Sequence, residues 1–354
     1  MDIYVMDGLS GVIGIVQTFQ SVIWNMQFYG SGDFQLIVPG TAANVDLLQP
    51  GRLLVRDVDR GDGEYHNVMK IQDRKYSYDI EQGWILEVSG PGLKRIVGQR
   101  VVWEQTNISG TVEDGIRQVL TDNIISPDDS ARAISNFILA DAAGITDTIE
   151  TQLFGENIAD WLESISQTYG FGWDVYIKNG KYVFALVKGT DRTYNQAAVD
   201  PVVFSPDFDN LVSASYERSM TDYMNAALVG GEGEGTDQVI TSVGSASGED
   251  RYEGYIDGGS VSSNGEIITM ETYLAMLQEY GLEQMTGTQY VNKFTGETIQ
   301  NGMYVLNRDY FLGDLVQIDL NAFRAATRII EIIYAEDMNG TSLIPTFSEW
   351  EVNE

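Results

Sequence analysis

The chain has 354 residues, with 21 Lys and Arg against 52 Asp and Glu, so its formal net charge is −31. A charge this negative repels phosphate, which argues against a conventional nucleic-acid-binding protein and against attachment to anionic membrane surfaces. Cysteine is absent and His66 is the single histidine, which excludes disulfides, cysteine-based zinc sites, iron–sulfur clusters, thiol nucleophiles and three-histidine metal sites within one chain. An enzyme built from this chain would depend on carboxylates, Ser, Thr, Tyr or Lys.

The N-terminal sequence lacks the features of a targeting segment. The first basic residue is Arg52, so no positively charged region precedes an apolar stretch as in a secretory signal peptide. Residues 8–32 carry no charge, but glycines and several Gln, Asn, Ser and Thr interrupt them, whereas a bilayer-spanning helix needs about 20 mostly apolar residues. We therefore expect two strands around a turn, in a soluble protein that is not exported by the usual route.

Short strands dominate the first hundred residues. Val22, Trp24, Met26 and Phe28 recur at period two, which predicts a strand with one apolar face. Short, numerous strands without a long helix are typical of a small barrel or sandwich, so we expect a first β-barrel domain over residues 1–105. Its expected strands cover residues 3–6, 12–19, 22–28, 34–38, 53–55, 68–71 and 84–88.

The pattern then changes to helices and strands together. Thr111 and Asp114 stand at capping-box positions before an apolar pattern, which predicts a helix that follows Thr111. Asn179-Gly180 between two apolar runs predicts a hairpin turn. We predict an α+β domain over residues 106–200, with a second helix over 156–169 and a hairpin of 171–176 with 181–187.

Strands and loops return in the last part of the chain. Enrichment in glycine, serine and aspartate predicts a long loop over 241–265, around a strand at 251–256. Asp-Met-Asn-Gly at 337–340 predicts a hairpin turn between the last two strands. Because the length allows roughly two to three domains, we expect a second β-barrel domain over 201–354. It would contain a strand at 225–229, a helix at 270–285, a C-terminal hairpin, and strands at 315–320, 327–334 and 343–350.

Two acidic, glycine-containing segments resemble ligand-binding loops at first sight. An EF-hand loop that started at Asp57 would need oxygen ligands where Gly61 and Val68 stand. Residues 231–235 alternate glycine with glutamate and lack the lysine of a phosphate-binding loop. We interpret the first segment, 57–64, as an acidic hairpin turn and the second as a flexible acidic loop.

Residue types that could carry catalysis show no distinguishing arrangement. His66 would have to be the base of a Ser-His-Asp triad, but a lone histidine at a strand edge is more often incidental. Carboxylate pairs for glycoside hydrolysis are inevitable among 52 acids, and nothing in the local sequence singles out two of them. We predict no catalytic, cofactor-binding or metal-binding residue. Tryptophans could form a sugar-binding platform, although most lie in apolar patterns typical of a core: Trp24, Trp84, Trp103, Trp161, Trp173 and Trp350.

The order of several short motifs resembles a known family, most fully over residues 1–105. The motifs are Val22-x-Trp24, Gly32-x-Phe34, Pro39-Gly40, Leu47-Leu48-x-Pro50-Gly51, Ile85-Leu86-Glu87-Val88-Ser89-Gly90, and then Leu93, Ile96, Arg100 and Trp103. This order is similar to that of the siphophage tail-hub, or tail-associated baseplate, proteins of the virion Gp37-like family. These proteins are similar in turn to the baseplate hub of contractile-tailed phages. The later helices and strands fit the family in outline.

The resemblance implies a mainly β fold of two related small β-barrel domains with an intervening α+β domain. It implies a structural virion protein, neither an enzyme nor dependent on a cofactor: a homotrimeric tail hub at the tail tip whose three chains form a pseudo-six-fold ring. That ring would join the six-fold tail tube to the three-fold tip and pass the tape-measure protein and DNA. Its partners would be the distal tail protein, the tape-measure protein and tip or fibre proteins, and it would be made in the host cytoplasm.

Particular residues take roles from the same resemblance. Trp24 and Phe34 would fill the first barrel, and Gly90 would permit the turn before Leu93 and Ile96. Some family members carry a C-terminal peptidoglycan-cleaving or fibre extension. Because this sequence stops at its residue 354, we expect no enzymatic domain.

Two questions stay open from the sequence. The carboxylates could line the ring so that DNA slides through without binding, since like charges prevent phosphate contacts, or they could only keep an assembly component soluble. The function could also be that of a carbohydrate-binding or cell-wall-cleaving module of the tail tip. An adhesin-like surface protein is a weaker alternative, because no export signal is present.

Overall fold

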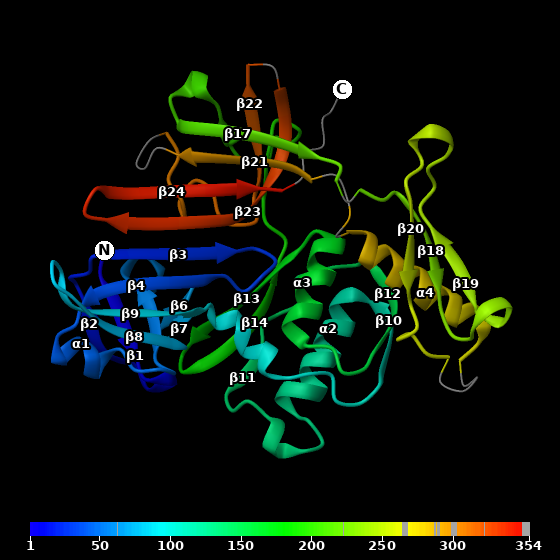
Figure 1. Ribbon diagram of the computed structural model, residues 1–354, viewed down its shortest axis with the longest axis horizontal. Helices are drawn as coiled ribbons and strands as arrows, with labels where there is room; N and C mark the ends of the chain where they lie inside the picture. The colour runs from blue at the N-terminus through cyan, green and yellow to red at the C-terminus, as the bar shows by residue number, and fades with distance from the viewer. Residues whose placement is uncertain are drawn as a thin grey trace.

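The computed structural model describes residues 1–61, 63–221, 223–263, 268–286, 288, 291–298, 303–321 and 323–348. Strands dominate this part of the chain, and few helices accompany them (Figure 1). The mainly β fold expected from the sequence is therefore confirmed. None of the described helices is long and apolar enough to cross a bilayer.

One eleven-stranded sheet forms the left part of the molecule in Figure 1. Its main path runs β17-β21-β24-β23-β3-β4-β9-β8, and every neighbouring pair on it is antiparallel. The strands on this path are β3 (Ser21–Gln27), β4 (Asp33–Pro39), β8 (Asp73–Asp79), β9 (Gly83–Pro91), β17 (Leu211–Ser219), β21 (Val291–Thr298), β23 (Phe323–Asp337) and β24 (Gly340–Phe347). Off the path, β22 (Leu315–Leu320) pairs with β23 and with the short strands β15 (Asp191–Arg192) and β16 (Val203–Phe204).

The main path contains the same strand order twice. We call β3, β4, β8 and β9 the N-terminal unit, and β17, β21, β23 and β24 the C-terminal unit. Numbered by their order in the chain, the strands of each unit lie side by side as 1-2-4-3. The two units meet where β23, third in its unit, pairs with β3, first in the other. Segments far apart in the sequence thus form one continuous sheet.

The N-terminal unit buries one face under a smaller sheet. That sheet has the order β2-β1-β5-β7, and α1 (Ala42–Leu47) follows β4 in the chain. Trp24 and Phe34 are fully buried in the shared core with their ring centroids 5.7 Å apart, so they fill a core between two sheets and not the interior of a closed barrel. The bounds are β1 (Ile3–Met6), β2 (Val12–Val16), β5 (Leu53–Arg56) and β7 (Met69–Lys70).

Gly90 is required for a different reason from the one expected. It lies inside β9 and not in a turn. A Cβ atom at this position would collide with the backbone carbonyl oxygen of Lys70. The glycine therefore permits close approach of two backbones. Leu93 and Ile96 follow in a buried 3-10 helix, Leu93–Gln99.

The middle of the chain packs helices against short strands. Thr111 caps α2, because its hydroxyl oxygen accepts a hydrogen bond from the amide of Asp114 at 3.1 Å, as the capping pattern predicted. The hairpin of β13 and β14 turns at Asn179-Gly180, both with positive φ, as expected. The elements here are β6 (Glu64–Tyr65), β10 (Thr106–Thr111), α2 (Val112–Leu120), β11 (Phe137–Leu139), β12 (Thr148–Leu153), α3 (Ile158–Tyr169), β13 (Gly172–Lys178) and β14 (Lys181–Val187).

A small module stands at the right of Figure 1. It is a three-stranded sheet in the order β19-β18-β20, packed against α4 around a core of its own. The predicted loop over 241–265 is wrong at its start, because part of it pairs with β18 as β19. The bounds are β18 (Ala226–Gly230), β19 (Ile240–Val243), β20 (Glu253–Asp257) and α4 (Met270–Thr286).

The expected closed barrels are not found among the described residues. The large sheet is open, with β17 at one end of its main path and β8 at the other. A barrel needs these end strands to pair, and within one chain they lie at opposite ends of the same sheet. The predicted strand at 343–350 ends earlier, with β24 at Phe347, and residues 349 and 350, including Trp350, lie outside the described residues.

Candidate functional site

The large sheet has a free edge at each end of its main path. Among the described strands, β8 pairs only with β9 and β17 only with β21, so each presents one row of N–H and C=O groups without a strand partner. Long free edges pair readily with another chain unless charge, proline or a covering loop protects them. β8 and β17 are therefore candidate assembly edges.

Exposed aromatic side chains mark the β8 edge. The rings of Tyr76 and Trp84 stack with centroids 4.8 Å apart and an interplanar angle of 5°, and Tyr78 lies 5.2 Å from Trp84. All three side chains are about half exposed or more, as is Ile80 in the adjoining turn. Contiguous apolar surface of this kind typically marks an interaction site. The sequence suggested a core role for most tryptophans, but Trp84, on β9 next to the edge strand, is half exposed.

A row of carboxylates crosses the face of the large sheet that points away from the core. Glu331 accepts hydrogen bonds from Gln27 (3.3 Å) and Thr346 (2.9 Å), and Glu87 accepts one from Gln35 (2.6 Å). The other two carboxylates are bound in the same way: Asp33 by Asn25 at 2.9 Å, and Glu297 by Ser342 at 2.9 Å. We call Asp33, Glu87, Glu297 and Glu331 the carboxylate row.

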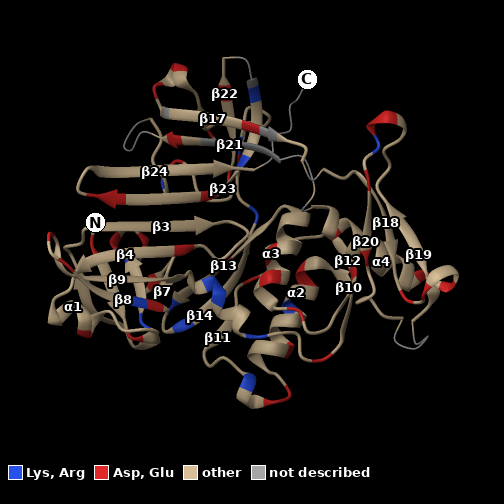
Figure 2. Ribbon diagram, in the orientation of Figure 1, with Lys and Arg blue, Asp and Glu red and all other residues tan. Residues whose placement is uncertain are grey.

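The side chains that bind the carboxylate row are neutral, so these hydrogen bonds do not compensate its negative charge. Among the described residues, no Lys or Arg forms an ion pair with any of the four carboxylates. Among the described side chains, Lys75 is the one basic residue opposite the row in register, facing Glu87 across β8 and β9. Acidic residues are spread over the whole chain (Figure 2), so overall charge alone would not have identified this row.

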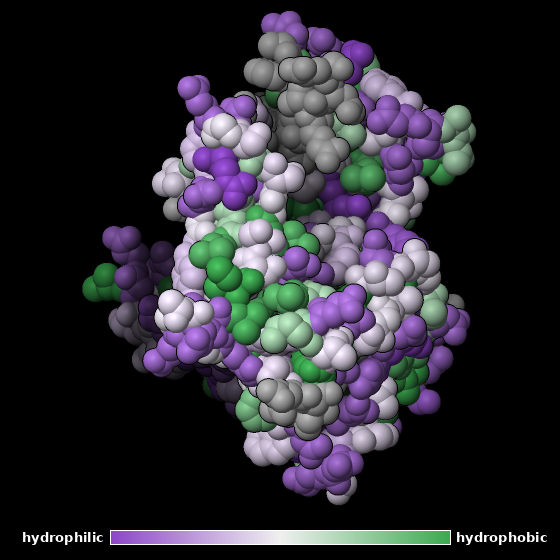
Figure 3. All heavy atoms as spheres, turned by 90° about the vertical axis from the view of Figure 1, so that its right-hand side faces the viewer, coloured by the Kyte–Doolittle hydropathy of each residue, from purple (hydrophilic) through white to green (hydrophobic). Residues whose placement is uncertain are grey.

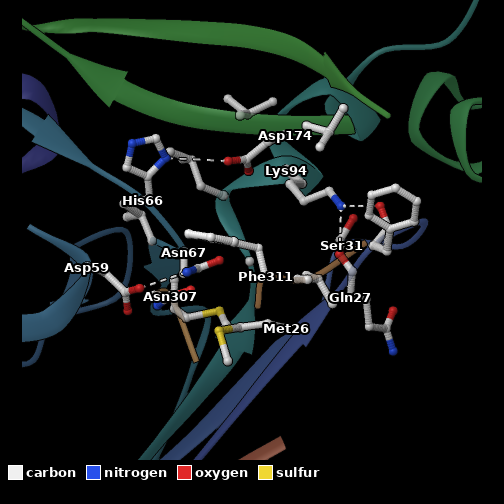
Figure 4. A pocket seen from close by; sticks show the side chains of 18 of the residues that line it. Met26, Gln27, Ser31, Asp59, His66, Asn67, Lys94, Asp174, Asn307 and Phe311 are labelled. Atoms are coloured by element: carbon white, nitrogen blue, oxygen red, sulfur yellow. Dashed lines mark hydrogen bonds and ion pairs between the residues drawn. The ribbon is translucent and has the colours of Figure 1, made fainter. Parts of the chain in front are cut away.

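A central cavity of about 480 Å³ lies where the large sheet, β13 and a later loop meet (Figure 4). Lys94 is buried at its wall, where its ammonium donates hydrogen bonds to the carbonyl oxygens of Gln27 (2.9 Å) and Phe28 (3.1 Å). The same group lies 4.6 Å from the ring centroid of Trp173. Burial lowers the pKa of Lys94 to about 8, against the opposing attraction of Asp174.

His66 lies at the mouth of this cavity between two carboxylates. Its Nδ1 is 3.7 Å from Asp174 Oδ2 and its Nε2 is 3.5 Å from Glu64 Oε2, and its ring stacks on Tyr176. The nearby Asp174 carboxylate raises the pKa of His66, and Glu64 adds to this effect. Both ring nitrogens face acids, so the geometry suits an imidazolium cation and not the base of a serine nucleophile.

A buried ion pair closes the other side of the cavity. Arg56 Nε and Asp59 Oδ2 are 2.5 Å apart, and Asn67 donates to the second carboxylate oxygen at 2.7 Å. The Arg56 guanidinium lies between the rings of Trp24 (5.6 Å) and Tyr334 (5.4 Å). Because Trp24 belongs to β3 and Tyr334 to β23, the Arg56 guanidinium links the N-terminal unit to the C-terminal unit.

In the two loops that resembled ligand-binding sites, acidic side chains are bound to other residues of the chain. In the 57–64 segment the Asp59 carboxylate accepts a hydrogen bond from the Arg56 guanidinium. The described residues contain no group of three or more potential metal ligands. In the 231–235 loop the Glu232 carboxylate accepts hydrogen bonds from the hydroxyls of Ser262 (2.7 Å) and Ser263 (2.6 Å). These bonds lower the pKa of Glu232.

The small module exposes apolar side chains as well. Figure 3 views the molecule from this side and shows hydrophobic residues gathered in the middle of the face. The exposed aliphatic residues of the module are Leu228, Ile240, Met270 and Leu282. No motif in the sequence predicted this surface.

Comparison with solved structures gives the fold. The chain is similar to the 43 kDa tail protein of prophage MuSo2 from Shewanella oneidensis, with a TM-score of 0.61 and 14% identity over 99% of this chain and 98% of that one. It is also similar to a tail protein from Neisseria meningitidis MC58 (TM-score 0.58, 15% identity, 98% and 95% covered). Prophage tail protein gp18 from Listeria monocytogenes EGD-e follows (TM-score 0.53, 13% identity, 98% and 94% covered).

Comparison by sequence gives the family. No curated protein sequence matches the chain. A family model described as "Siphovirus ReqiPepy6 Gp37-like protein" matches residues 2–347. That match spans both four-strand units and everything between them, so the chain belongs to the Siphovirus ReqiPepy6 Gp37-like family.

Proposed function

We propose that this protein is a structural component of the phage tail and, more specifically, its trimeric hub. Three chains would form a ring at the tail tip that joins the six-fold tube to the three-fold tip and passes the tape-measure protein and DNA. The distal tail protein and tip or fibre proteins would be its neighbours in the virion. The likeness to prophage tail proteins supports the tail assignment.

One observation supports the ring proposal more than any other: the 1-2-4-3 strand order occurs twice, and the sheet has two free edges. Inside the chain, the third strand of the C-terminal unit pairs antiparallel with the first strand of the N-terminal unit. The free edges are β8, the third strand of the N-terminal unit, and β17, the first strand of the C-terminal unit. Pairing β8 of one chain with β17 of the next repeats the internal junction between chains.

Such a contact joins two different surfaces, so it generates a closed ring or an open filament. In a ring the two units alternate, and three chains place six similar units around the axis. This gives pseudo-six-fold geometry on a true three-fold axis. The two units of each chain would then be two of the six parts of one shared barrel, which explains why neither closes within one chain.

In the proposed ring, the carboxylate row lines the central passage. In the N-terminal unit, one face of the large sheet is covered by the small β2-β1-β5-β7 sheet, and the face with the row points away from it. If that face lines the lumen, uncompensated carboxylates repel the phosphates of the passing DNA. DNA would then move through without stable contacts.

Engineered disulfides test the ring, because the chain has no cysteine of its own. Ser77→Cys on β8 combined with Ser213→Cys or Ser215→Cys on β17 should yield covalent trimers on a non-reducing gel, and each single variant should yield no higher species than dimers. Electron microscopy should show three-chain rings of the 39.2 kDa protein. Folded protein that stays monomeric at high concentration and forms no cross-link in any pairing would refute the hub proposal.

A further inference from the structure

A second cavity, of about 520 Å³, lies in the middle part of the chain, apart from both assembly edges. It is bounded by the segment 103–107, by the end of α2 and by residues 122–132. Its volume falls within the range of small-molecule sites, about 300–1,000 Å³. We call it the Trp103 groove.

The groove contains an aromatic ring held in an exposed position. Trp103 is 63% exposed, and the guanidinium of Arg132 lies 5.0 Å from its ring centroid. Both are fixed by Asn123, which is only 3% exposed: its Oδ1 accepts hydrogen bonds from the Trp103 amide (3.1 Å) and from Arg132 (3.1 Å). A buried amide that positions an exposed ring is the arrangement of a preorganised binding site.

The local backbone is unusual at the same place. Residues Thr121–Ile125 continue α2 as a π-helical turn, closed by a hydrogen bond from the Ser126 amide to the Thr121 carbonyl. Such turns are rare and occur frequently at functional sites. Here the turn contributes Asp122 and Asn123 to the groove.

The polar groups of the groove define its ligand. Among the described residues, the carboxylates of Glu104 and Asp122 and the amide of Gln118 have no hydrogen-bond partner and are exposed. A saccharide fits these groups, because the C–H face of a pyranose packs on an indole while its hydroxyls donate to carboxylates and accept from amides. Carboxylates around the groove and a net charge of −31 repel anionic chains.

We propose that the Trp103 groove binds a neutral saccharide chain, with one pyranose ring on the indole of Trp103. Arg132 and Asn123 are positioning residues for that ring, and Glu104, Gln118 and Asp122 are the hydrogen-bonding groups. The site lies outside the sheet edges, so binding does not depend on ring formation and does not rest on the proposed hub function.

Titration of the full chain with three probes tests this site: tri-N-acetylchitotriose, maltotriose and an anionic trigalacturonate. At least one neutral probe should quench tryptophan fluorescence and show saturation-transfer NMR contacts with a Kd of about 1 mM or lower, the range of a weak but specific site. Trp103→Ala should weaken that binding by about tenfold or more, a loss of about 1.4 kcal/mol. The matched control is Trp84→Ala, which removes another exposed tryptophan (52%) and should leave the affinity unchanged.

Two further variants keep the test decisive. Asp122→Asn and Glu104→Gln preserve shape, and each should reduce the affinity for the neutral probe while circular dichroism and the melting temperature stay the same. The proposal is overturned if no neutral probe binds with a Kd of about 1 mM or lower. It is also overturned if the anionic probe binds more tightly, or if Trp103→Ala changes oligomeric state and leaves probe binding intact, which would assign the groove to a protein contact.

Discussion

The guanidinium of Arg56 on β5 lies 5.4 Å from the ring centroid of Tyr334 on β23, and because it also lies 5.6 Å from the ring of Trp24 on β3, it links the two four-strand units. Arg56 also forms a buried ion pair with Asp59. Removal of one partner from such a pair leaves an uncompensated charge away from water. The Arg56 side chain therefore stabilises the joint between the units as well as the charge beside it.

Arg56→Met should lower the free energy of unfolding by about 3–5 kcal/mol, because the Asp59 carboxylate stays buried without its cation. Urea denaturation followed by tryptophan fluorescence measures the change. The double variant Arg56→Met with Asp59→Leu should recover much of the loss, since it removes the buried charge too. Arg95→Met breaks a pair with Asp160 that is exposed on both sides, and an equal loss there would contradict the argument.

The β8 edge should fail to pair when it carries an added negative charge. Tyr78→Asp places a carboxylate within the exposed aromatic cluster, and charge on an edge strand opposes strand addition. The expected result is loss of the trimer in mass photometry, with an unchanged far-ultraviolet circular dichroism spectrum. Met338→Asp is the matched control, because Met338 is 90% exposed at the turn between β23 and β24. Equal trimer content in both variants would exclude β8 from the interface.

Sequence patterns predicted the elements in which burial alternates and missed those in which it does not. In β3, Val22, Trp24 and Met26 alternate with exposed or half-buried neighbours, so period two was visible. β8 has no buried residue, because an edge strand beyond the covering sheet has no face that packs against another element. The strand that carries the proposed interface therefore had no apolar period to reveal it.

The cavity and the carboxylate row were also beyond a sequence reading. Lys94, Trp173 and Asn307 line one cavity from three distant parts of the chain. Glu87 and Glu331 share a row only because β23 pairs with β3. A capping box such as the one at Thr111 is local, so the sequence does reveal it, whereas these contacts depend on the order of strands.

The stability contributed by His66 should depend on pH. Asp174 and then Glu64 raise its pKa above the usual value of 6.5. The folded state therefore binds the proton more tightly than the unfolded state, so the contribution is complete below about pH 6.5 and is lost as pH rises through the raised folded pKa. The difference in free energy of unfolding between the native protein and His66→Gln should shrink as pH rises above about 6.5. Asp174→Asn should flatten this dependence, and an equal pH profile for native protein and His66→Gln would contradict it.

The carboxylate row should control how freely DNA passes. Glu331→Lys and Glu297→Lys place cations on the proposed lumen face, where each phosphate contact adds salt-dependent affinity. Virions carrying either variant should release DNA more slowly in a dye-based ejection assay, and added salt should restore the rate. Glu331→Gln keeps a hydrogen-bonding group in place and should have a small effect. Glu249→Lys, in the 3-10 helix Gly248–Asp250 of the distant small module, gives the same change of charge away from the sheet. If all four variants eject at the native rate, the acids serve solubility and the row does not line the passage.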